Sequence, residues 1–342
     1  MAAYESLGYE VDLFSTWTAD QPHFEQSGIR LKDIEFSQRW IAKNVGRPVW
    51  RRYAAFSATT EDPLAAAGLL SQLWRRPLIT LADEIRSGSY SGNRSRRWKE
   101  LCRWGMRRSS LTVVNEAERV HLQRDFAGLA AGSPMLVYPG CFRELPLMGF
   151  REGLRQSRGI PDDALVLCYS GLMSYGNGGL WLAEALAQCP TLWVWGQLVN
   201  LDSLTRGLLE RLHGSERLVL EKERMSWQDS WSSMAAMDIG MVIYLQEAPQ
   251  YRHMGTASNR LCMFLAMGVP VIASRQPSFG FIERYDCGVL VDGIGEMQLA
   301  VEKIASRLDV MRANARDCAR EYIRAPERWM DLRDALGRIL RT

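Results

Sequence analysis

The stretch YRHMGTASNRLCMFLAMGVPVIAS, Tyr251–Ser274, predicts half of a parallel α/β unit. A short polar loop precedes a helix in which Leu261 and Leu265 lie one turn apart on the same face. Gly268 stands where a helix needs a left-handed residue to end, and Val269–Ala273 has the composition of a buried strand. The segment is therefore expected to form, in order, a loop, a helix, a turn and a strand.

The start of this helix is the predicted anion site. The first turn of a helix has free backbone N–H groups, and the helix dipole favours negative charge there. Thr256, Ser258 and Asn259 can cap the helix start, and Arg260 adds a planar cation suited to phosphate. An ordinary capped surface helix is the alternative.

The segment SNRLCMFLAMGVPVIAS, followed by FIERYDCGVLV, resembles the donor-binding segment of family-4 GT-B glycosyltransferases. The resemblance implies an α/β fold of two Rossmann-like domains facing a cleft, with the diphosphate of a nucleotide sugar at this helix start. The sequence departs from the family pattern at two positions. The glutamate that usually contacts the donor ribose would fall at Met263, and its partner would fall at Gly255.

The resemblance also implies the domain boundaries. Residues 1–142 would form an N-terminal Rossmann-like acceptor-side domain, and residues 143–322 a C-terminal nucleotide-sugar-binding domain. Residues 323–342 would form a final helix that crosses back to the first domain. Family members have an earlier strand and a Gly-containing loop before the segment that begins this chain. We therefore expect either a misplaced start site or a first domain lacking its first strand.

Apolar runs alternate with helical segments through both halves, as in doubly wound α/β domains. Ligands of such sheets collect beyond the carboxyl ends of the strands, so the loops that follow the strands hold the candidates. The expected strands are Glu10–Phe14, Arg52–Ser57, Leu78–Leu81, Leu111–Asn115, Met135–Tyr138, Ala164–Ser170, Thr191–Trp195, Leu218–Leu220 and Ile239–Tyr244.

The polar loop after Leu78–Leu81 holds the first-domain candidates. Asp83 is the candidate catalytic acid or base toward an acceptor hydroxyl, and Arg86 is a candidate for binding an anionic group. A solvated loop with a capping carboxylate is the alternative. Similar loops in the family face the cleft, which favours Asp83.

In the second half, Ala164–Ser170 leads into the Gly-rich loop GLMSYGNGGL, where backbone amides near Gly171 form a candidate anion cradle. The spacing is not G-x-G-x-x-G, so it does not indicate a nicotinamide cofactor. By resemblance, Leu172 and Asn177 stand where family members carry the arginine and lysine that bind donor phosphates. Backbone amides and Arg260 would then take over that binding.

The resemblance assigns the remaining candidates. The loops after two further strands, near Gly196 and near Met225 and Ser226, would enclose the nucleotide base. Tyr251, Arg252 and His253 would face the cleft, and Arg252 is a further candidate for the phosphates. The chain has four histidines without paired ligand spacing and no D-x-D motif, so we expect no metal site.

The stretch RSRRWKELCRWGMRR, Arg94–Arg108, is the most basic in the chain, and Trp50-Arg51-Arg52 and Trp74-Arg75-Arg76 add further basic-aromatic pairs. A basic first domain suits peripheral contact with an anionic membrane and a lipid-linked acceptor. A helix with one solvated basic face is the alternative. Nucleic acid is disfavoured because the net charge is only +3.

Composition is that of a soluble globular protein, with 47% hydrophobic and 24% charged residues. The seven cysteines are scattered and form no C-x-x-C pair, which predicts buried thiols in a reducing compartment. No apolar run reaches the ~20 residues of a membrane span, and no signal peptide is evident. We expect a cytoplasmic protein, with peripheral attachment at the inner membrane face as an open alternative.

Together these features predict a glycosyltransferase of the GT-B kind. It would move a sugar from a nucleotide-diphosphate-sugar donor to the hydroxyl of a glycan, lipid-linked or small-molecule acceptor, without a metal and without a cofactor. The resemblance implies retention of the anomeric configuration. A GT-B nucleotide-sugar epimerase or hydrolase is one alternative. A non-catalytic GT-B partner or truncated pseudoenzyme is another, because of Met263, Gly255 and the missing strand.

Overall fold

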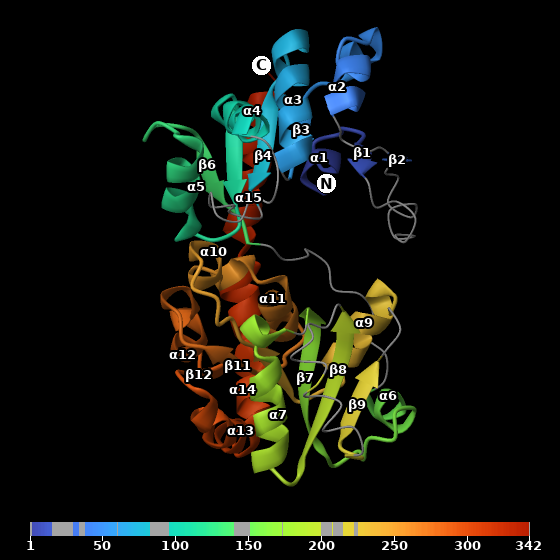
Figure 1. The fold of residues 1–342 in the computed structure, drawn as a ribbon, viewed down its shortest axis with the longest axis vertical. Coiled ribbons are helices and arrows are strands. Elements are labelled where there is room, and N and C mark those ends of the chain that lie inside the picture. The colour runs from blue at the N-terminus through green and yellow to red at the C-terminus, as the bar shows by residue number, and fades with distance from the viewer. Residues whose placement is uncertain are drawn as a thin grey trace. The chain divides into compact units, whose positions relative to one another are not determined.

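The computed structural model describes residues 2–15, 30–33, 38–59, 61–82, 96–139, 151–172, 174–199, 207, 215–221 and 225–341. The chain divides into two compact units, each with its own parallel sheet (Figure 1). Unit 1 comprises Met1–Tyr138 and Pro326–Thr342, and unit 2 comprises Pro139–Ala325. The last segment of the chain therefore belongs to the first unit.

Unit 2 contains, within its described residues, a six-stranded parallel sheet in the order β12-β11-β10-β7-β8-β9. Its core strands are short runs of buried apolar residues, as expected of a sheet covered on both faces. Strand order reverses between β7 and β10, which makes that gap the topological switch point. The strands are β7 (Leu165–Leu172), β8 (Leu192–Val199), β9 (Leu218–Glu221), β10 (Ile239–Val242), β11 (Val271–Ser274) and β12 (Gly288–Val291).

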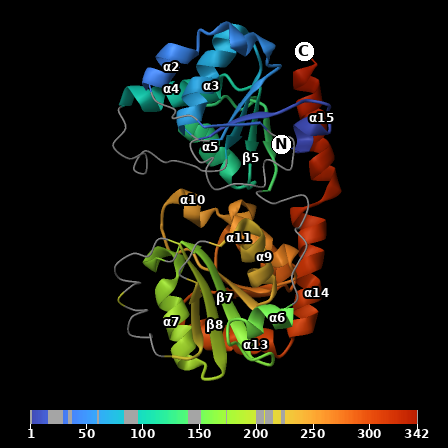
Figure 2. The ribbon, with the colours of Figure 1, turned by 90° about the vertical axis from the view of Figure 1, so that its right-hand side faces the viewer.

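Helices cover both faces of this sheet (Figure 2). Residues of α7 and α13 form one hydrophobic cluster with the strands, and residues of α9, α11 and α14 form another. The helical segments are α6 (Arg151–Gln156), η3 (Tyr175–Asn177), α7 (Gly179–Gln188), α9 (Trp227–Ala235), α10 (Pro249–Arg252), η4 (Gly255–Ala257), α11 (Asn259–Ala266), η5 (Pro277–Phe279), α12 (Gly280–Arg284), η6 (Ile294–Glu296), α13 (Met297–Ala305), α14 (Leu308–Cys318) and η7 (Ala319–Ile323).

Unit 1 contains a parallel sheet in the order β3-β4-β5-β6 and a separate parallel pair, β1 and β2. Its strands are β1 (Asp12–Ser15), β2 (Arg30–Asp33), β3 (Phe56–Ala58), β4 (Leu78–Ala82), β5 (Leu111–Val114) and β6 (Met135–Val137). Its helical segments are α1 (Ala2–Glu5), α2 (Gln38–Asn44), η2 (Pro48–Arg52), α3 (Glu61–Trp74), α4 (Arg96–Arg107), α5 (Arg119–Ala127) and α15 (Pro326–Leu340).

The C-terminal helix α15 completes the core of unit 1. Its residues Leu332 and Leu336 are buried in one cluster with Ala3 of α1 and Ile79 of β4. Figures 1 and 2 show α15 beside α1. No helix in the described part of the chain is long and apolar enough to cross a bilayer.

The predicted α/β fold is confirmed, with corrections at several element ends. The strand expected at Arg52–Ser57 is wrong in its first half, because Pro48 starts the 3-10 helix η2 and β3 begins only at Phe56. The strand expected at Thr191–Trp195 continues to Val199. The cysteines that the structure describes are buried thiols outside any disulfide, as the sequence predicts.

The contact between α3 and α4 depends on two glycines. A Cβ on Gly105 would stand 2.8 Å from the backbone oxygen of Leu64, and one on Gly68 would stand 2.9 Å from the Cα of Gly105. Only glycine allows the two helix backbones to approach so closely. This close crossing packs α4 against α3 in unit 1.

We expect Gly105→Ala to lower the free energy of unfolding by about 1–3 kcal/mol, because the added methyl group must push the helices apart. Urea unfolding measures the change. Gly132→Ala is the matched control, since a Cβ there meets no atom within 4 Å, and it should change stability by less than about 0.5 kcal/mol. Equal effects of the two substitutions would contradict the close helix crossing.

Candidate functional site

The start of α11 is built by Ser258, which caps the helix. Its hydroxyl oxygen accepts a hydrogen bond from the backbone N–H of Leu261 at 3.2 Å. The same hydroxyl lies 2.8 Å from the hydroxyl of Tyr244, just beyond β10. The cap therefore joins the helix start to the loop at the carboxyl end of a central strand.

The cap leaves the first two amides of the helix available. Among the described residues, the backbone N–H groups of Asn259 and Arg260 donate no hydrogen bond. The side chain of Asn259 is exposed. Free amides at a helix start, supported by the helix dipole, are the usual way in which proteins bind phosphate.

Arg260 connects α11 to the switch point of the sheet. Its Nη1 donates to the backbone oxygen of Ser170, near the end of β7, at 3.0 Å. Its Cζ lies 5.1 Å from the ring centroid of Tyr169 and 5.3 Å from that of Tyr244. The guanidinium thus lies close to two aromatic rings, one in β7 and one just beyond β10, and these two strands flank the switch point.

Burial by itself would lower the pKa of Arg260. The neighbouring oxygens of Tyr244 and Tyr169 outweigh that effect, so the net shift of the pKa of Arg260 is upward. The side chain is half-buried and carries a permanent positive charge. A fixed cation beside free amides gives this end of the sheet a positive potential.

Gly171 lies at the same place, near the end of β7. Its φ of +103° is in the region that favours glycine, and a Cβ built there meets no atom within 4 Å. Arg260 therefore links the strand residue next to Gly171 to the start of α11, and binding of donor phosphates there stays a prediction. Asn177 is buried, and its side chain donates to the hydroxyl of Ser174.

The candidates for the base-binding loops lie in different surroundings. Gly196, expected just after a strand, lies inside β8, where it pairs with Tyr169 and Leu220. Met225 packs against the large core cluster of unit 2. Ser226 caps α9, accepting from the backbone N–H of Asp229 at 3.1 Å. Gly196 is therefore a strand residue, and β8 continues beyond it to Val199.

The segment before α11 places its candidates on two short helical turns. Tyr251 is half-buried, and its ring stacks 6.2 Å from that of Tyr244. Arg252 is exposed, with Nη2 3.8 Å from the carboxylate of Glu247. His253 follows α10 as its C-cap and is half-buried, whereas Thr256 is buried in η4. Tyr251 therefore extends the aromatic stack around Arg260, and Arg252 has a solvated guanidinium.

The two first-domain candidates, Asp83 and Arg86, lie outside the described residues. The strand that leads to them, β4, ends at Ala82. No group of three or more His, Cys, Asp or Glu side chains in the described segments is arranged to hold a metal ion.

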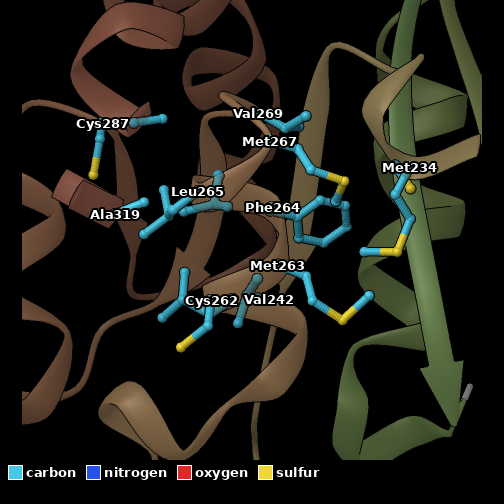
Figure 3. Close-up of a cluster of buried hydrophobic side chains, with 14 of the residues drawn as sticks. Met234, Val242, Cys262, Met263, Phe264, Leu265, Met267, Val269, Cys287 and Ala319 are labelled. Carbon is cyan, nitrogen blue, oxygen red and sulfur yellow. The ribbon is translucent and has the colours of Figure 1, made fainter. Parts of the chain in front are cut away.

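Met263, at the position of the family glutamate, is a core residue. Only 8% of its surface is exposed, and it lies in one cluster with Met234, Phe264 and Met267 (Figure 3). Gly255 is buried and its N–H donates to the hydroxyl of Ser278 at 3.0 Å. The carboxylates of the family pattern are therefore replaced by apolar packing and by backbone.

The sequence analysis missed Tyr169 and Tyr244 as site residues. Both were included in predicted strands, where an aromatic side chain is normally a packing residue. Tyr244 was the last residue of one predicted strand and Tyr169 the second-last of another, and this was the available signal, because strand ends at a switch point face the ligand. The structure adds both of them to the environment of Arg260.

No model of a known protein family matches the chain, and no curated protein sequence matches it. Solved structures do match. HepE (Alr3699) from Anabaena, in complex with UDP-glucose, gives a TM-score of 0.72 at 18% identity, over 92% of this chain and 88% of that one. Sucrose-phosphate synthase from Thermosynechococcus elongatus gives 0.75 at 14% identity, over 99% and 91%.

A glycosyltransferase from Rickettsia africae gives a TM-score of 0.73 at 13% identity, over 100% of this chain and 93% of that one. At such identities the likeness concerns the fold. The strand order of unit 2, the parallel sheet of unit 1 and the return of α15 to unit 1 agree with it. The chain therefore has the GT-B fold, the α/β architecture of these glycosyltransferases.

Proposed function

We propose that the protein is a glycosyltransferase that uses a nucleotide-diphosphate sugar and transfers the sugar to an acceptor hydroxyl. One observation carries the proposal: the permanently charged Arg260 donates to Ser170, near the end of β7 at the switch point of unit 2, and two amides at the start of its helix donate no hydrogen bond among the described residues. A nucleoside diphosphate is a dianionic or trianionic leaving group, and these groups would neutralise its charge as the glycosidic bond breaks.

In this proposal the amides of Asn259 and Arg260 bind the diphosphate oxygens, and Gly171 lets the ligand approach the backbone of β7. The acceptor side would come from unit 1, with Asp83 as the candidate base. HepE binds UDP and UDP-glucose, so UDP is the first nucleotide to test. We infer that no metal or cofactor is needed, since Arg260 and the helix dipole supply positive charge.

Calorimetric titration of the full chain with UDP, GDP, ADP and CMP tests donor binding. We expect one of them to bind in the micromolar range. Arg260→Ala should then raise its Kd about 5- to 150-fold, which corresponds to about 1–3 kcal/mol for a charge-assisted hydrogen-bonding group. Arg260→Lys should retain part of the affinity, because the charge stays but the planar fork is lost.

Arg284→Ala is the matched control. The guanidinium of Arg284 also stacks on two tyrosine rings of unit 2, with Cζ 5.8 Å from the ring centroid of Tyr285 and 5.2 Å from that of Tyr322. Its removal should leave nucleotide affinity unchanged. If Arg260→Ala binds the nucleotide as tightly as the parent protein, Arg260 does not bind the phosphates. If the parent protein binds none of the nucleotides, the proposed function is wrong.

A non-catalytic GT-B partner protein is the second candidate. It is favoured by the burial of Met263 and by Gly255, since neither supplies the carboxylate found in the family pattern. Incubation with UDP-glucose, followed by measurement of released UDP with and without an acceptor mixture, separates the possibilities. Release that needs acceptor supports a transferase, release without acceptor supports a hydrolase, and nucleotide binding without turnover supports the partner.

A further inference from the structure

Three arginine pairs of unit 1 stand at the amino ends of three neighbouring strands. Residues 51–52 precede β3, residues 75–76 precede β4 and residues 107–108 precede β5. These strands are parallel and adjacent, so their amino ends share one edge of the sheet. All six arginines are exposed. The topology therefore gathers onto one surface charges that are far apart in sequence.

Direct contacts hold this surface together. Nη2 of Arg76 donates to the backbone oxygen of Arg51 at 3.1 Å, and Cζ of Arg51 lies 5.2 Å from the ring centroid of Trp74. Arg108 stacks on Trp104 at 5.5 Å. The pairs before β3 and β4 are thus in contact, and the third pair precedes the next strand, β5.

This surface has almost no compensating negative charge. Residues 38–59, 63–82 and 101–115 contain no Asp or Glu. Among the described residues, Arg52 pairs with Asp12, whereas Arg51, Arg75, Arg76 and Arg108 pair with no carboxylate. One cation near the carboxyl end of a helix is enough to interact favourably with the negative end of the helix dipole. The dipole therefore does not explain why the arginines occur in pairs.

Exposed aliphatic side chains stand near these cations in the sequence. Val49 is 44% exposed and Leu73 is 53% exposed, each two residues before an arginine pair. Arg75 adopts a left-handed φ of 51°, where glycine is the usual residue, so a charge occupies a position that a side chain disfavours. Cations alone would suit any polyanion, but exposed aliphatic groups gain only from an apolar environment.

We propose that this surface, the arginine edge (Val49, Leu73 and the three arginine pairs), rests on an anionic lipid bilayer. The arginines would attract the headgroups, while Val49 and Leu73 enter the boundary between headgroups and acyl chains. The contact is peripheral and reversible. It is independent of the donor site, because it lies at the amino edge of the unit 1 sheet and needs no nucleotide.

Sedimentation of the full chain with vesicles tests the proposal, using phosphatidylcholine alone or with phosphatidylglycerol as a minority component. We expect binding only to the anionic vesicles, weakening as salt is raised. The variant Arg51→Gln/Arg75→Gln/Arg76→Gln/Arg108→Gln should lose at least about tenfold in partition coefficient. Arg52 and Arg107 stay unchanged because they bond to Asp12 and to the backbone oxygen of Ala127.

The control variant removes the same charge from exposed cations of unit 2, with Gln at Arg284, Lys303, Arg307 and Arg320, and should bind vesicles like the parent. A second variant, Val49→Ser/Leu73→Ser, should bind anionic vesicles several-fold more weakly but bind heparin, a soluble polyanion, unchanged. Thermal melting checks that each variant is folded.

Three results would overturn the proposal. The first is failure of the parent protein to bind anionic vesicles. The second is an equal loss of vesicle binding in the unit 2 control, which would show a general effect of net charge. The third is unchanged vesicle binding by Val49→Ser/Leu73→Ser, which would make the arginine edge a site for soluble polyanions such as nucleic acid.

Discussion

Replacing Asp238 with alanine should lower the free energy of unfolding by about 3–5 kcal/mol. Oδ2 of Asp238 accepts from Nη2 of Arg155 at 2.6 Å and from the backbone N–H of Val166 at 2.8 Å. Oδ1 accepts from Nη2 of Arg312 at 2.6 Å. Side-chain exposure is 2% for Asp238 and 0% for Arg155, so removal of the carboxylate leaves a fully buried guanidinium without a counter-charge.

The effect on Arg155 explains the size of the expected loss. Its Nε and Nη1 donate to the backbone oxygens of Ala236, Asp162 and Ala164, so the side chain cannot turn out to solvent without breaking those bonds. Asp238 also fixes the starts of β7 and β10, the two strands that flank the switch point. Its loss should therefore destabilise the frame of the site.

Urea unfolding, followed by tryptophan fluorescence, measures the change. Asp317→Ala is the control, because its pair with Arg320 is solvated, with side-chain exposures of 48% and 67%, and should contribute less than about 1 kcal/mol. The loss of unfolding free energy in Asp238→Asn should lie between the losses in Asp238→Ala and Asp317→Ala, since asparagine keeps the shape and one acceptor oxygen but not the charge. Similar losses for Asp238→Ala and Asp317→Ala would contradict the role of the buried pair.

The sequence predicted the central α/β units well because their signals are local. The apolar run before Ser170 has the pattern of a buried strand, and the segment from Ser258 to Ser274 has that of a capped helix followed by a buried strand. Element ends were less predictable: Gly196 was expected to end a strand, but pairing with strands on both sides carries β8 through it. Neighbouring strands, which no local pattern reveals, decided that case.

The site was predictable only in part, for a similar reason. Ser258 as the cap and Arg260 as the nearby cation follow from helix rules that act within a few residues. The contact of Arg260 with Ser170, 90 residues earlier, and its place between Tyr169 and Tyr244 depend on tertiary structure. Asp238 and its two arginines escaped the sequence analysis entirely, since its partners lie more than 70 residues away.

Among substitutions that remove buried apolar contacts, we expect the largest loss of stability at Phe264, whose ring packs α11 against the sheet. Phe264 is fully buried at the centre of the cluster shown in Figure 3. A Cβ on Gly240, in β10, would lie 2.5 Å from its ring. The ring therefore packs directly on the backbone of a central strand, and Phe264→Ala should cost about 3–5 kcal/mol of unfolding free energy.

A double-mutant cycle tests the contact between the ring of Phe264 and Gly240. Gly240→Ala alone should cost about 1–3 kcal/mol, because the new methyl group overlaps the ring. In the Phe264→Ala background the same methyl group enters the vacated space, so the two losses should fall short of additivity by about 0.5–3 kcal/mol. Leu299→Ala, at a position that is 67% exposed, is the control and should change little.

The same cycle connects packing to the proposed donor site. Phe264 lies four residues after Arg260 on the same helix. If α11 loses the contact of the Phe264 ring with the sheet, its first amides are no longer held in a fixed position. We expect Phe264→Ala to weaken nucleotide binding, and Gly240→Ala/Phe264→Ala to regain part of the affinity together with part of the stability. Strict additivity in unfolding free energy would mean that the ring does not rest on Gly240, and the helix start would then need another support.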